Sequence, residues 1–320
     1  MNEPIQIQEI AKDAGRVGKE ISEALSRTLV DMQSVIEQVV IATIAGGHVL
    51  LEGVPGTAKT TLCRCLGTVL GMDYRRIQFT PDLLPSDVTG TKIFNQAKSE
   101  FVLQTGPVFC QLLLADELNR APARTQSALL EAMQERQVTI EGETMPLPAP
   151  FIVLATQNPV EQEGVYRLPE AQLDRFMFRV RVGYPQRSGE IDLLEMQEAP
   201  APPAVKICDG EKIVRLQSFV DSVHASRELK AYIVDLIRAT REHRDVLLGA
   251  SPRAGIFMLR AARARALLHG KSFCTHEDVQ AIGHPVLEHR VIMRPEAELS
   301  GRDISSVLTE VIKSVPVLEG

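Results

Sequence analysis

The residues best suited to do chemistry lie between 47 and 61, in the sequence GHVLLEGVPGTAKTT. A short apolar run precedes a turn of small residues, and Lys59 and Thr60 then open a helical pattern. Small residues let backbone N–H groups approach phosphate oxygens, and a helix N-terminus adds a favourable dipole. The lysine can reach β- and γ-phosphates, and the threonine hydroxyl can bind Mg²⁺. The spacing therefore predicts a nucleotide-phosphate site, with an ordinary Gly/Pro turn as the alternative.

This segment, the phosphate loop, supplies eight predicted binding residues: Gly53, Pro55, Gly56, Thr57, Ala58, Lys59, Thr60 and Thr61. Ala58 departs from the usual pattern, because a glycine commonly precedes the lysine. Alanine carries a Cβ, so we expect it to be acceptable only if its φ is negative and the phosphates do not need the space.

A second candidate group follows 57 residues after the lysine, where LLLADE at 112–117 ends an apolar run in two carboxylates. A strand of this kind would lie beside the phosphate loop. Asp116 would then hold Mg²⁺ through water, and Glu117 would polarise the water that attacks a γ-phosphate. Alternatively, the two acids simply cap the next helix.

Alternating strand-like and helix-like segments must position these groups. The strand-like runs are 49–51, 77–79, 112–115, 151–155 and 176–182, and the helix-like segments between them are 60–70 and 124–136. Two more helices are expected within 21–45, broken near Asp31 and ending at Gly46-Gly47. This alternation predicts an α/β fold, a parallel sheet covered by helices on both faces.

Insertions and a boundary divide the chain further. Segments 80–106 and 137–148 interrupt the alternation, and the second reads as a hairpin turning at Glu141-Gly142. An Ala/Pro cluster at 199–204 predicts a boundary. We expect a nucleotide-binding αβα domain at 1–185, a linker at 186–210 and an all-helical lid domain at 211–320.

Composition excludes several other classes. The net charge of −6 and an aromatic content of 4% without Trp argue against nucleic acid as a partner. The expected hairpin sets three glutamates, at 135, 141 and 143, against Arg136 alone, which repels phosphate backbones. Neither the five cysteines nor the seven histidines have metal-ligand spacing. We see no leader and no membrane-spanning run, and so expect a cytoplasmic protein.

Four longer segments carry a family resemblance: GVPGTAKT, LLLADELNRAPARTQSALLEAMQERQVTIEG, ATQNP and LPEAQLDRF. Together they resemble an AAA+ ATPase of the MoxR family, from about Val35 to the SPRA at 251–254. The long central run is the most specific part. The resemblance implies an AAA+ P-loop domain with a helical lid, ATP and Mg²⁺ as ligands, and a ring, expected to be a hexamer, that remodels or activates protein clients.

The resemblance also implies roles for three residues outside the phosphate loop. Asn158 in ATQNP matches sensor 1, which positions the lytic water, and Arg175 in LPEAQLDRF matches the arginine finger that reaches a neighbouring subunit's nucleotide. Arg253 in SPRA matches sensor 2, a lid arginine. For Asn158, the alternative is a turn residue before Pro159. For Arg175, it is a helix cap or a partner of Asp174. For Arg253, it is a residue at a plain helix start.

Two positions are less regular. Arg120 could be a further intersubunit arginine, although a surface or structural cation is the favoured interpretation. In TLVDM at 28–32, Asp31 and Met32 replace the glycine and glutamine of a family element that lines the adenine pocket. The assignment of ATP over other nucleotides therefore follows from the resemblance.

The resulting hypothesis is an ATP-hydrolysing chaperone ring acting on a protein client, with a von Willebrand factor A-type partner, in enzyme maturation or metal insertion. One alternative is an assembly scaffold or switch that hydrolyses ATP slowly or only with a client, but the intact Glu117 argues against a pure switch. Another is a chelatase-type ATPase subunit, which shares the insertions.

Overall fold

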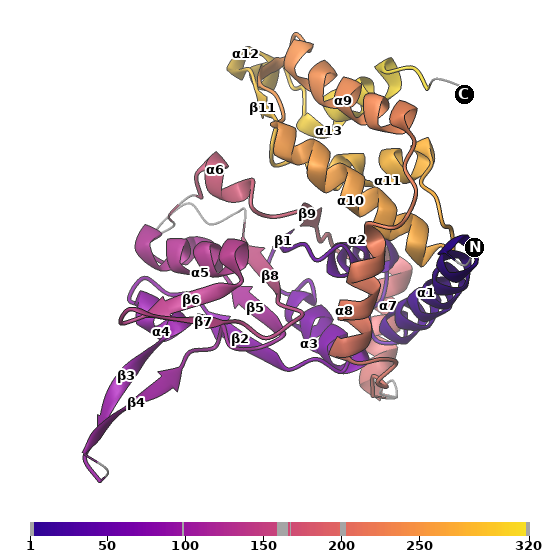
Figure 1. Cartoon of the computed structure of the whole chain (residues 1–320). Coiled ribbons are helices and arrows are strands. Elements are labelled where there is room, and N and C mark those ends of the chain that lie inside the picture. The colour runs from indigo at the N-terminus through magenta and orange to yellow at the C-terminus, as the bar shows by residue number, and fades with distance from the viewer. Residues whose placement is uncertain (1–2, 98, 159–165, 167, 199–202, 318–320) are drawn as a thin grey trace.

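A five-stranded parallel sheet forms the centre of the N-terminal region (Figure 1). The computed structural model describes residues 3–97, 99–158, 166, 168–198 and 203–317. The strand order is β2-β5-β8-β1-β9, and the bounds are β1 Val49–Glu52, β2 Tyr74–Gln78, β5 Leu112–Asp116, β8 Ile152–Gln157 and β9 Phe178–Arg181. All five predicted strands are present and every pairing is parallel, which confirms the predicted sheet.

Alternate residues of the strands pack into two separate cores. Leu112 and Leu114 join the core on one face of the sheet, whereas Leu113 and Ala115 join the core on the other. The first face is covered by α1 (Glu3–Ser26), α2 (Gln33–Ile44) and α3 (Lys59–Val69), and the second by α4 (Pro85–Thr89) and α5 (Ala123–Glu135). Burial on both faces explains why these strands are continuous apolar runs.

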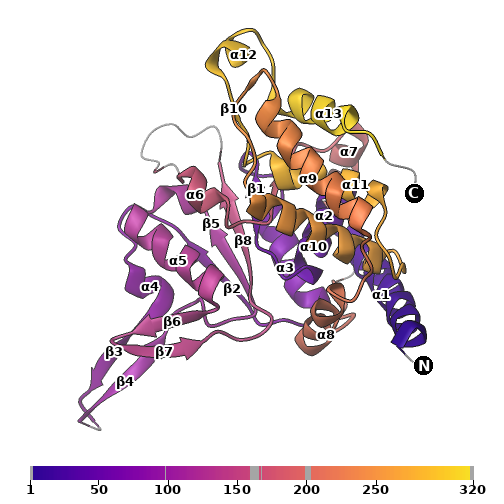
Figure 2. The same cartoon turned by 45° about the horizontal axis from the view of Figure 1, so that its top comes forward.

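Two hairpins extend from the second face (Figures 1 and 2). One is built from β3 (Gly90–Asn95) and β4 (Glu100–Thr105) and projects away from the body, and the other from β6 (Gln137–Ile140) and β7 (Glu143–Pro146). The expected turn is present, with φ of 48° at Glu141 and 84° at Gly142. Lys92 joins the hairpins through a 2.8 Å ion pair with Glu143.

The C-terminal region is helical, as expected, with a small addition. Its helices are α7 Arg187–Glu198, α8 Gly210–Val220, α9 Arg227–Glu242, α10 Pro252–Leu268, α11 His276–Leu287, α12 Pro295–Leu299 and α13 Ile304–Ser314. Strands β10 (Val246–Leu248) and β11 (Ile292–Met293) form an antiparallel pair that the expectation of an all-helical lid omitted. Runs of three and two residues are too short to show a strand pattern.

Helix α7 lies inside the segment 186–210 that was expected to be a linker, and residues 199–202 of the Ala/Pro cluster fall outside the described part of the chain. The division at 185 and 210 stays a prediction. Two short helical segments, η1 (Leu118–Arg120) and α6 (Glu170–Leu173), complete the fold. Among the described residues, no helix combines the length and apolarity needed to cross a bilayer.

The helical region shares its core with the sheet region. One buried cluster runs from the sheet through α1 and α2 into α8, α10 and α11. Two hydrogen bonds reinforce it at the end of α2: Gln217 Nε2 donates to Thr43 O at 2.8 Å, and Arg260 Nε donates to Ala45 O at 2.6 Å. The lid therefore packs against the N-terminal helices α1 and α2.

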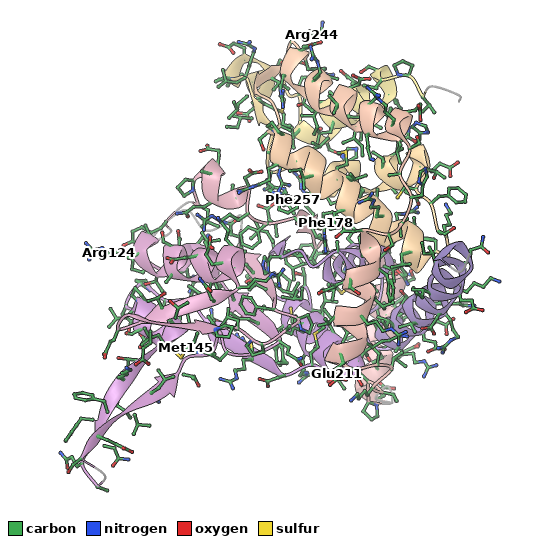
Figure 3. The ribbon with its side chains drawn as sticks, viewed as in Figure 1. Arg124, Met145, Phe178, Glu211, Arg244 and Phe257 are labelled. Atoms are coloured by element: carbon green, nitrogen blue, oxygen red, sulfur yellow. The ribbon has the colours of Figure 1, made fainter. Side chains whose placement is uncertain are left out.

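A second link between the regions centres on the buried guanidinium of Arg290. It donates to Asp174 Oδ1 at 2.6 Å, to Phe176 O at 2.5 Å and to Met177 O at 3.2 Å. Its Cζ lies 5.0 Å from the ring centre of Phe257 on α10. Phe257 is labelled in Figure 3. Burial lowers the pKa of Arg290 to about 10, although the Asp174 carboxylate acts in the opposite direction. The segment that carries Arg175 is thereby tied to the helical region.

Strand β1 is fixed at its start by His48. The ring accepts the Val153 N–H at Nδ1 at 3.0 Å, so Nε2 carries the proton and donates to Met133 O at 3.1 Å. Complete burial lowers the pKa of His48 to about 3. The neutral tautomer thus joins β1, β8 and α5.

We expect this histidine to make stability fall with acid. Because its native pKa lies below the unfolded value, the unfolded chain takes up a proton first as pH drops below about 6.5. Between pH 7 and pH 5 the free energy of unfolding should decrease by about 2 kcal/mol from this group. Urea titrations at both pH values should show a smaller decrease in His48→Gln than in wild type. The exposed His224→Gln is the control, and equal decreases in all three proteins would refute the assignment.

We also expect Asp174→Asn to destabilise the fold, because it leaves the buried Arg290 without its counter-ion. The loss should be about 3 kcal/mol. The matched control is Asp221→Asn, which breaks a 2.9 Å pair with Arg260 whose aspartate is 61% exposed, and which should cost at most about 1 kcal/mol. Urea denaturation of both variants measures the difference, and similar losses would contradict a structural role for the Asp174 pair.

Candidate functional site

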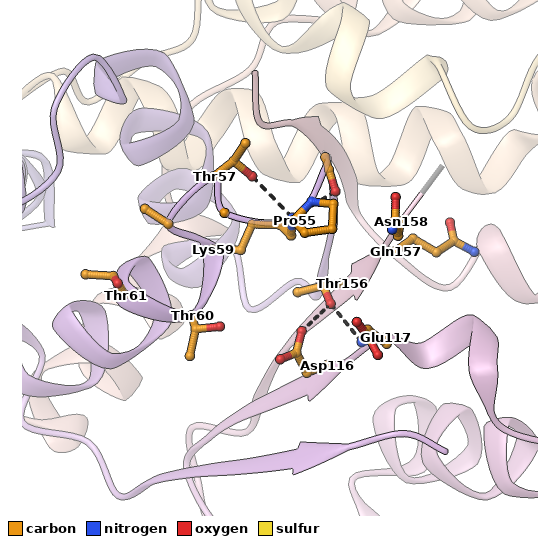
Figure 4. Close-up of a pocket in the computed structure, with 13 residues that line it drawn as sticks. Pro55, Thr57, Lys59, Thr60, Thr61, Asp116, Glu117, Thr156, Gln157 and Asn158 are labelled. Carbon is orange, nitrogen blue, oxygen red and sulfur yellow. Dashed lines mark hydrogen bonds between the residues drawn. The ribbon is translucent and has the colours of Figure 1, made fainter. Parts of the chain in front are cut away.

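Three strands that are neighbours in the sheet, β5, β8 and β1, end side by side and form one cavity (Figure 4). Its volume is about 470 Å³. The lining residues come from the phosphate loop and from the ends of β5 and β8: Gly53, Pro55, Gly56, Thr57, Ala58, Lys59, Thr60, Thr61, Asp116, Glu117, Thr156, Gln157 and Asn158. The structure thus brings together all eight predicted loop residues with Asp116, Glu117 and Asn158. Arg175 and Arg253 are not among the lining residues.

Backbone conformation in the loop explains one glycine and corrects one expectation. Gly56 has a φ of 83°, and a Cβ there would meet no atom within 4 Å. Ala58 was expected to need a negative φ, but its φ is 57°. This expectation is wrong, since the loop holds an alanine in the left-handed region at a cost of about 1–2 kcal/mol. Such strain is typical of functional loops.

Lys59 extends back over the loop from the first turn of α3. Its Nζ donates to Val54 O at 2.7 Å and to Gly53 O at 2.8 Å. Burial lowers the pKa of Lys59, while Asp116 and Glu117 act in the opposite direction. The ammonium group is therefore a cation set between backbone carbonyls and two carboxylates, where an anionic phosphate would complete its coordination.

Asp116 is held rigidly at the end of β5. Its Oδ1 accepts the Thr156 hydroxyl at 2.6 Å, and its Oδ2 accepts Arg76 Nη2 at 2.7 Å. The carboxylate is only 12% exposed. Because both oxygens have protein partners, the group is suited to holding a hydrated cation through water.

The backbone conformation of Glu117 and two neighbouring side chains fix the position of its carboxylate. Its φ is 56°, and its N–H donates to Thr156 Oγ1 at 2.8 Å. Its Oε2 accepts Gln78 Nε2 at 2.6 Å and lies 3.2 Å from Arg120 Nη1. Arg120 therefore contacts the glutamate of its own chain.

Sequence reasoning missed three of these partners, namely Arg76, Gln78 and Thr156. Gln78 is in register with Asp116 across the β2–β5 pair, and Thr156 lies near the end of β8, which pairs with the other side of β5. Only the strand order reveals these neighbours. The one available signal was the polar ending of the strand-like runs, which parallel pairing places at a common edge.

The two remaining predicted arginines lie near Asp174, outside the cavity. Arg175 Nη1 donates to Leu130 O of α5 at 2.8 Å. Arg253, in the first turn of α10, lies 3.8 Å from Asp174 Oδ2, with 46% of its side chain exposed. Asp174 itself pairs with Arg290, so the Asp174–Arg175 pair that was the alternative interpretation of Arg175 is not the main contact of that carboxylate.

A second cavity, of about 530 Å³, lies between the sheet region and α11. Asp31 and Met32 line it, together with Tyr184 and His284. Asp31 has a φ of 55°, and its Oδ2 accepts the Gln186 N–H at 2.9 Å. The carboxylate thus fixes the chain just before α7, and aspartate tolerates the left-handed conformation better than most residues other than glycine.

Comparisons with known proteins agree with this geometry. Residues 48–178 match the "ATPase family associated with various cellular activities (AAA)", and residues 238–311 match the "AAA lid domain". The chain is 45% identical to the Bacillus subtilis protein YeaC, with 94% of each chain covered. It is 42% identical to the chaperone MoxR1 of Mycobacterium tuberculosis, covering 91% of this chain and 80% of that protein.

Solved structures give the same result. A crystal structure of a candidate ATPase from Cytophaga hutchinsonii superposes with a TM-score of 0.91 at 39% identity, covering 100% of both chains. A further relative by sequence, the protein MoxR of Methylorubrum extorquens, is 30% identical, with 95% of this chain and 94% of that protein covered. The nucleotide-binding sheet, the lid and the sequence relatives together establish that this chain belongs to the MoxR family of AAA+ ATPases.

Proposed function

We propose that this protein is an ATP-hydrolysing MoxR-type chaperone that assembles into a ring and remodels or activates a protein client. The observation that carries the proposal is the single cavity where the phosphate loop with Lys59 faces Asp116 and Glu117. The Lys59 ammonium, the two carboxylates and the N-terminus of α3 are arranged there to bind a nucleoside triphosphate.

The donor set fits ATP with Mg²⁺. Backbone N–H groups of the phosphate loop and the Lys59 ammonium would bind the phosphates, and the open space around Gly56 leaves room for them. Thr60 and Asp116 would hold Mg²⁺, whose chemistry is to neutralise phosphate charge. The second cavity, lined by Asp31 and Met32, would take the adenine.

Glu117 would act as the general base. Its carboxylate accepts a proton from water as the water oxygen bonds to the γ-phosphorus and the bond to the β-phosphate oxygen breaks, giving ADP and phosphate. Asn158 would orient that water. Gln78 and Arg120 hold Oε2 of Glu117, which favours a variant of the proposal, a switch whose hydrolysis waits until a client breaks these contacts.

Arg175 and Arg253 would complete the site in a ring. Arg175 lies outside its own cavity, which supports a role at the nucleotide of a neighbouring subunit. Arg253 would act as a lid sensor, exchanging Asp174 for the γ-phosphate. The same proposal includes a hexamer, a von Willebrand factor A-type partner and a cytoplasmic location. It also includes the absence of nucleic-acid binding and of stable membrane insertion. A chelatase-type subunit is the remaining alternative.

Two substitutions separate binding from chemistry. Lys59→Ala should weaken ATP binding at least about tenfold, because it removes the principal phosphate cation. Glu117→Gln should keep the Kd within about threefold and lower kcat about 100-fold or more, because the amide cannot take the proton. Calorimetric titration and phosphate-release assays measure both quantities. Equal loss of binding in the two variants would contradict the assignment of Glu117 as the base.

A mixing experiment tests the shared site. Turnover per subunit should rise with protein concentration, and a mixture of Arg175→Ala and Glu117→Gln should recover activity that neither variant has alone. Recovery follows because some interfaces then combine an intact base with an intact finger. Turnover independent of concentration in a confirmed monomer would refute the trans-acting finger, and no turnover at any concentration would favour the client-triggered switch.

A further inference from the structure

Helix α7 is unusual in the described part of the chain because it exposes most of its side chains. Ile191 is 40% exposed and Leu194 is 70% exposed. They lie three positions apart and so share one face of the helix. Glu190, Glu195 and Glu198 lie beside this pair on the helix surface. We define Ile191, Leu194 and these glutamates as the α7 stripe, an apolar strip with an acidic border.

An apolar groove between α9 and α10 has the opposite charge at its border. Ile233, Val234 and Ile237 of α9 and Ile256 of α10 line it, with Lys230 and Arg238 at its edge. Its volume is about 340 Å³, and Val234 and Ile256 are 53% and 67% exposed. We call it the α9–α10 groove.

Gly255 keeps the groove open. It lies in α10 opposite α9, and a Cβ at this position would come 3.7 Å from Ile233 Cγ2, an ordinary contact distance. A side chain can therefore be added here without a clash. It would extend into the space that the groove now offers.

The stripe and the groove match in length and in charge. Helix α7 has 12 residues, about 18 Å of helix, and the α9 lining from Lys230 to Arg241 extends over about 17 Å. Glutamates border one surface, whereas a lysine and an arginine border the other. This complementarity selects an acidic amphipathic helix as the occupant.

Within one molecule the two surfaces cannot meet. In Figure 1 the faded α7 lies at the back of the molecule, whereas α9 and α10 lie at the front, and in Figure 2 α9 again lies in front of α7. We propose that the α9–α10 groove of one subunit binds the α7 stripe of the next. Because the two patches differ, the contact is head-to-tail, and it forms a ring if the rotation from one subunit to the next closes. The inference rests on the self-assembly in the proposed function and names its interface.

Sedimentation velocity with a non-hydrolysable ATP analogue tests this interface in the full chain. Leu194→Glu and Gly255→Leu should each reduce the fraction of assembled protein at least tenfold, the first by placing charge on the stripe and the second by filling the groove. Gly255→Leu is not expected to unfold the helix, because leucine favours helices more than glycine does. Leu299→Glu is the control, since this leucine is 89% exposed on α12 and belongs to neither the stripe nor the groove lining.

Charge exchange provides the second arm. One chain carries Glu190→Lys, Glu195→Lys and Glu198→Lys, and another carries Lys230→Glu and Arg238→Glu. Each chain alone should assemble poorly, because like charges then face each other. Their mixture should assemble, since every interface between alternating chains pairs opposite charges.

The outcomes separate the interface from the ring. Assembly of wild type and the control but not of the stripe and groove variants, with rescue by mixing, supports the proposal. If wild type assembles and the variants assemble equally well, the groove serves another partner and this inference is overturned while the ring stands. Wild type that remains monomeric with nucleotide at every concentration overturns both.

Discussion

The hydroxyl group of Thr156 is the interaction on which the site depends. It donates to Asp116 and accepts the N–H of Glu117, so one atom near the end of β8 fixes the carboxylate of Asp116 and the backbone of Glu117 at the end of β5. This is possible because β5 and β8 are parallel neighbours whose carboxyl ends coincide. With β1 on the other side of β8, the phosphate loop faces the same edge. Parallel pairing thus gathers groups that are far apart in the chain.

At this edge of the sheet, the charged side chains lie close to side chains of opposite charge. Arg76 neutralises one oxygen of Asp116, while Lys59 lies under the influence of both carboxylates. Burial makes every such pair stronger and every unpaired charge more costly. Backbone strain accompanies the charges, since Ala58 and Glu117 both have positive φ at the cavity wall. The surrounding sheet must hold these conformations, which is the usual arrangement where function demands unusual geometry.

The lid is connected to this edge by a separate set of contacts. Asp174 receives Arg290 from the segment after α11, and Arg253 of α10 approaches the same carboxylate. Arg175 follows Asp174 directly in the chain. A change in lid position would therefore move the residue that is proposed to reach a neighbouring subunit. The shared core of α1, α2, α8 and α10 limits how far the lid can move.

The sequence by itself determined the local features of this protein. Strand and helix periods, the small residues before Lys59 and the two carboxylates that end the apolar run at 112–117 predicted the sheet, the phosphate loop, Asp116 and Glu117, because each depends on neighbours in the chain. Asn158 followed from the resemblance of ATQNP to a family motif. Tertiary structure alone decided which residues support them. Gln78 and Arg76 reach the carboxylates only because of the order of the strands. The φ of Ala58 follows from the closed conformation of the phosphate loop. The opposite charges of α7 and of the α9–α10 groove form matching surfaces only when both are folded. Contacts between distant segments leave no periodic signal, and the chain must fold before they exist.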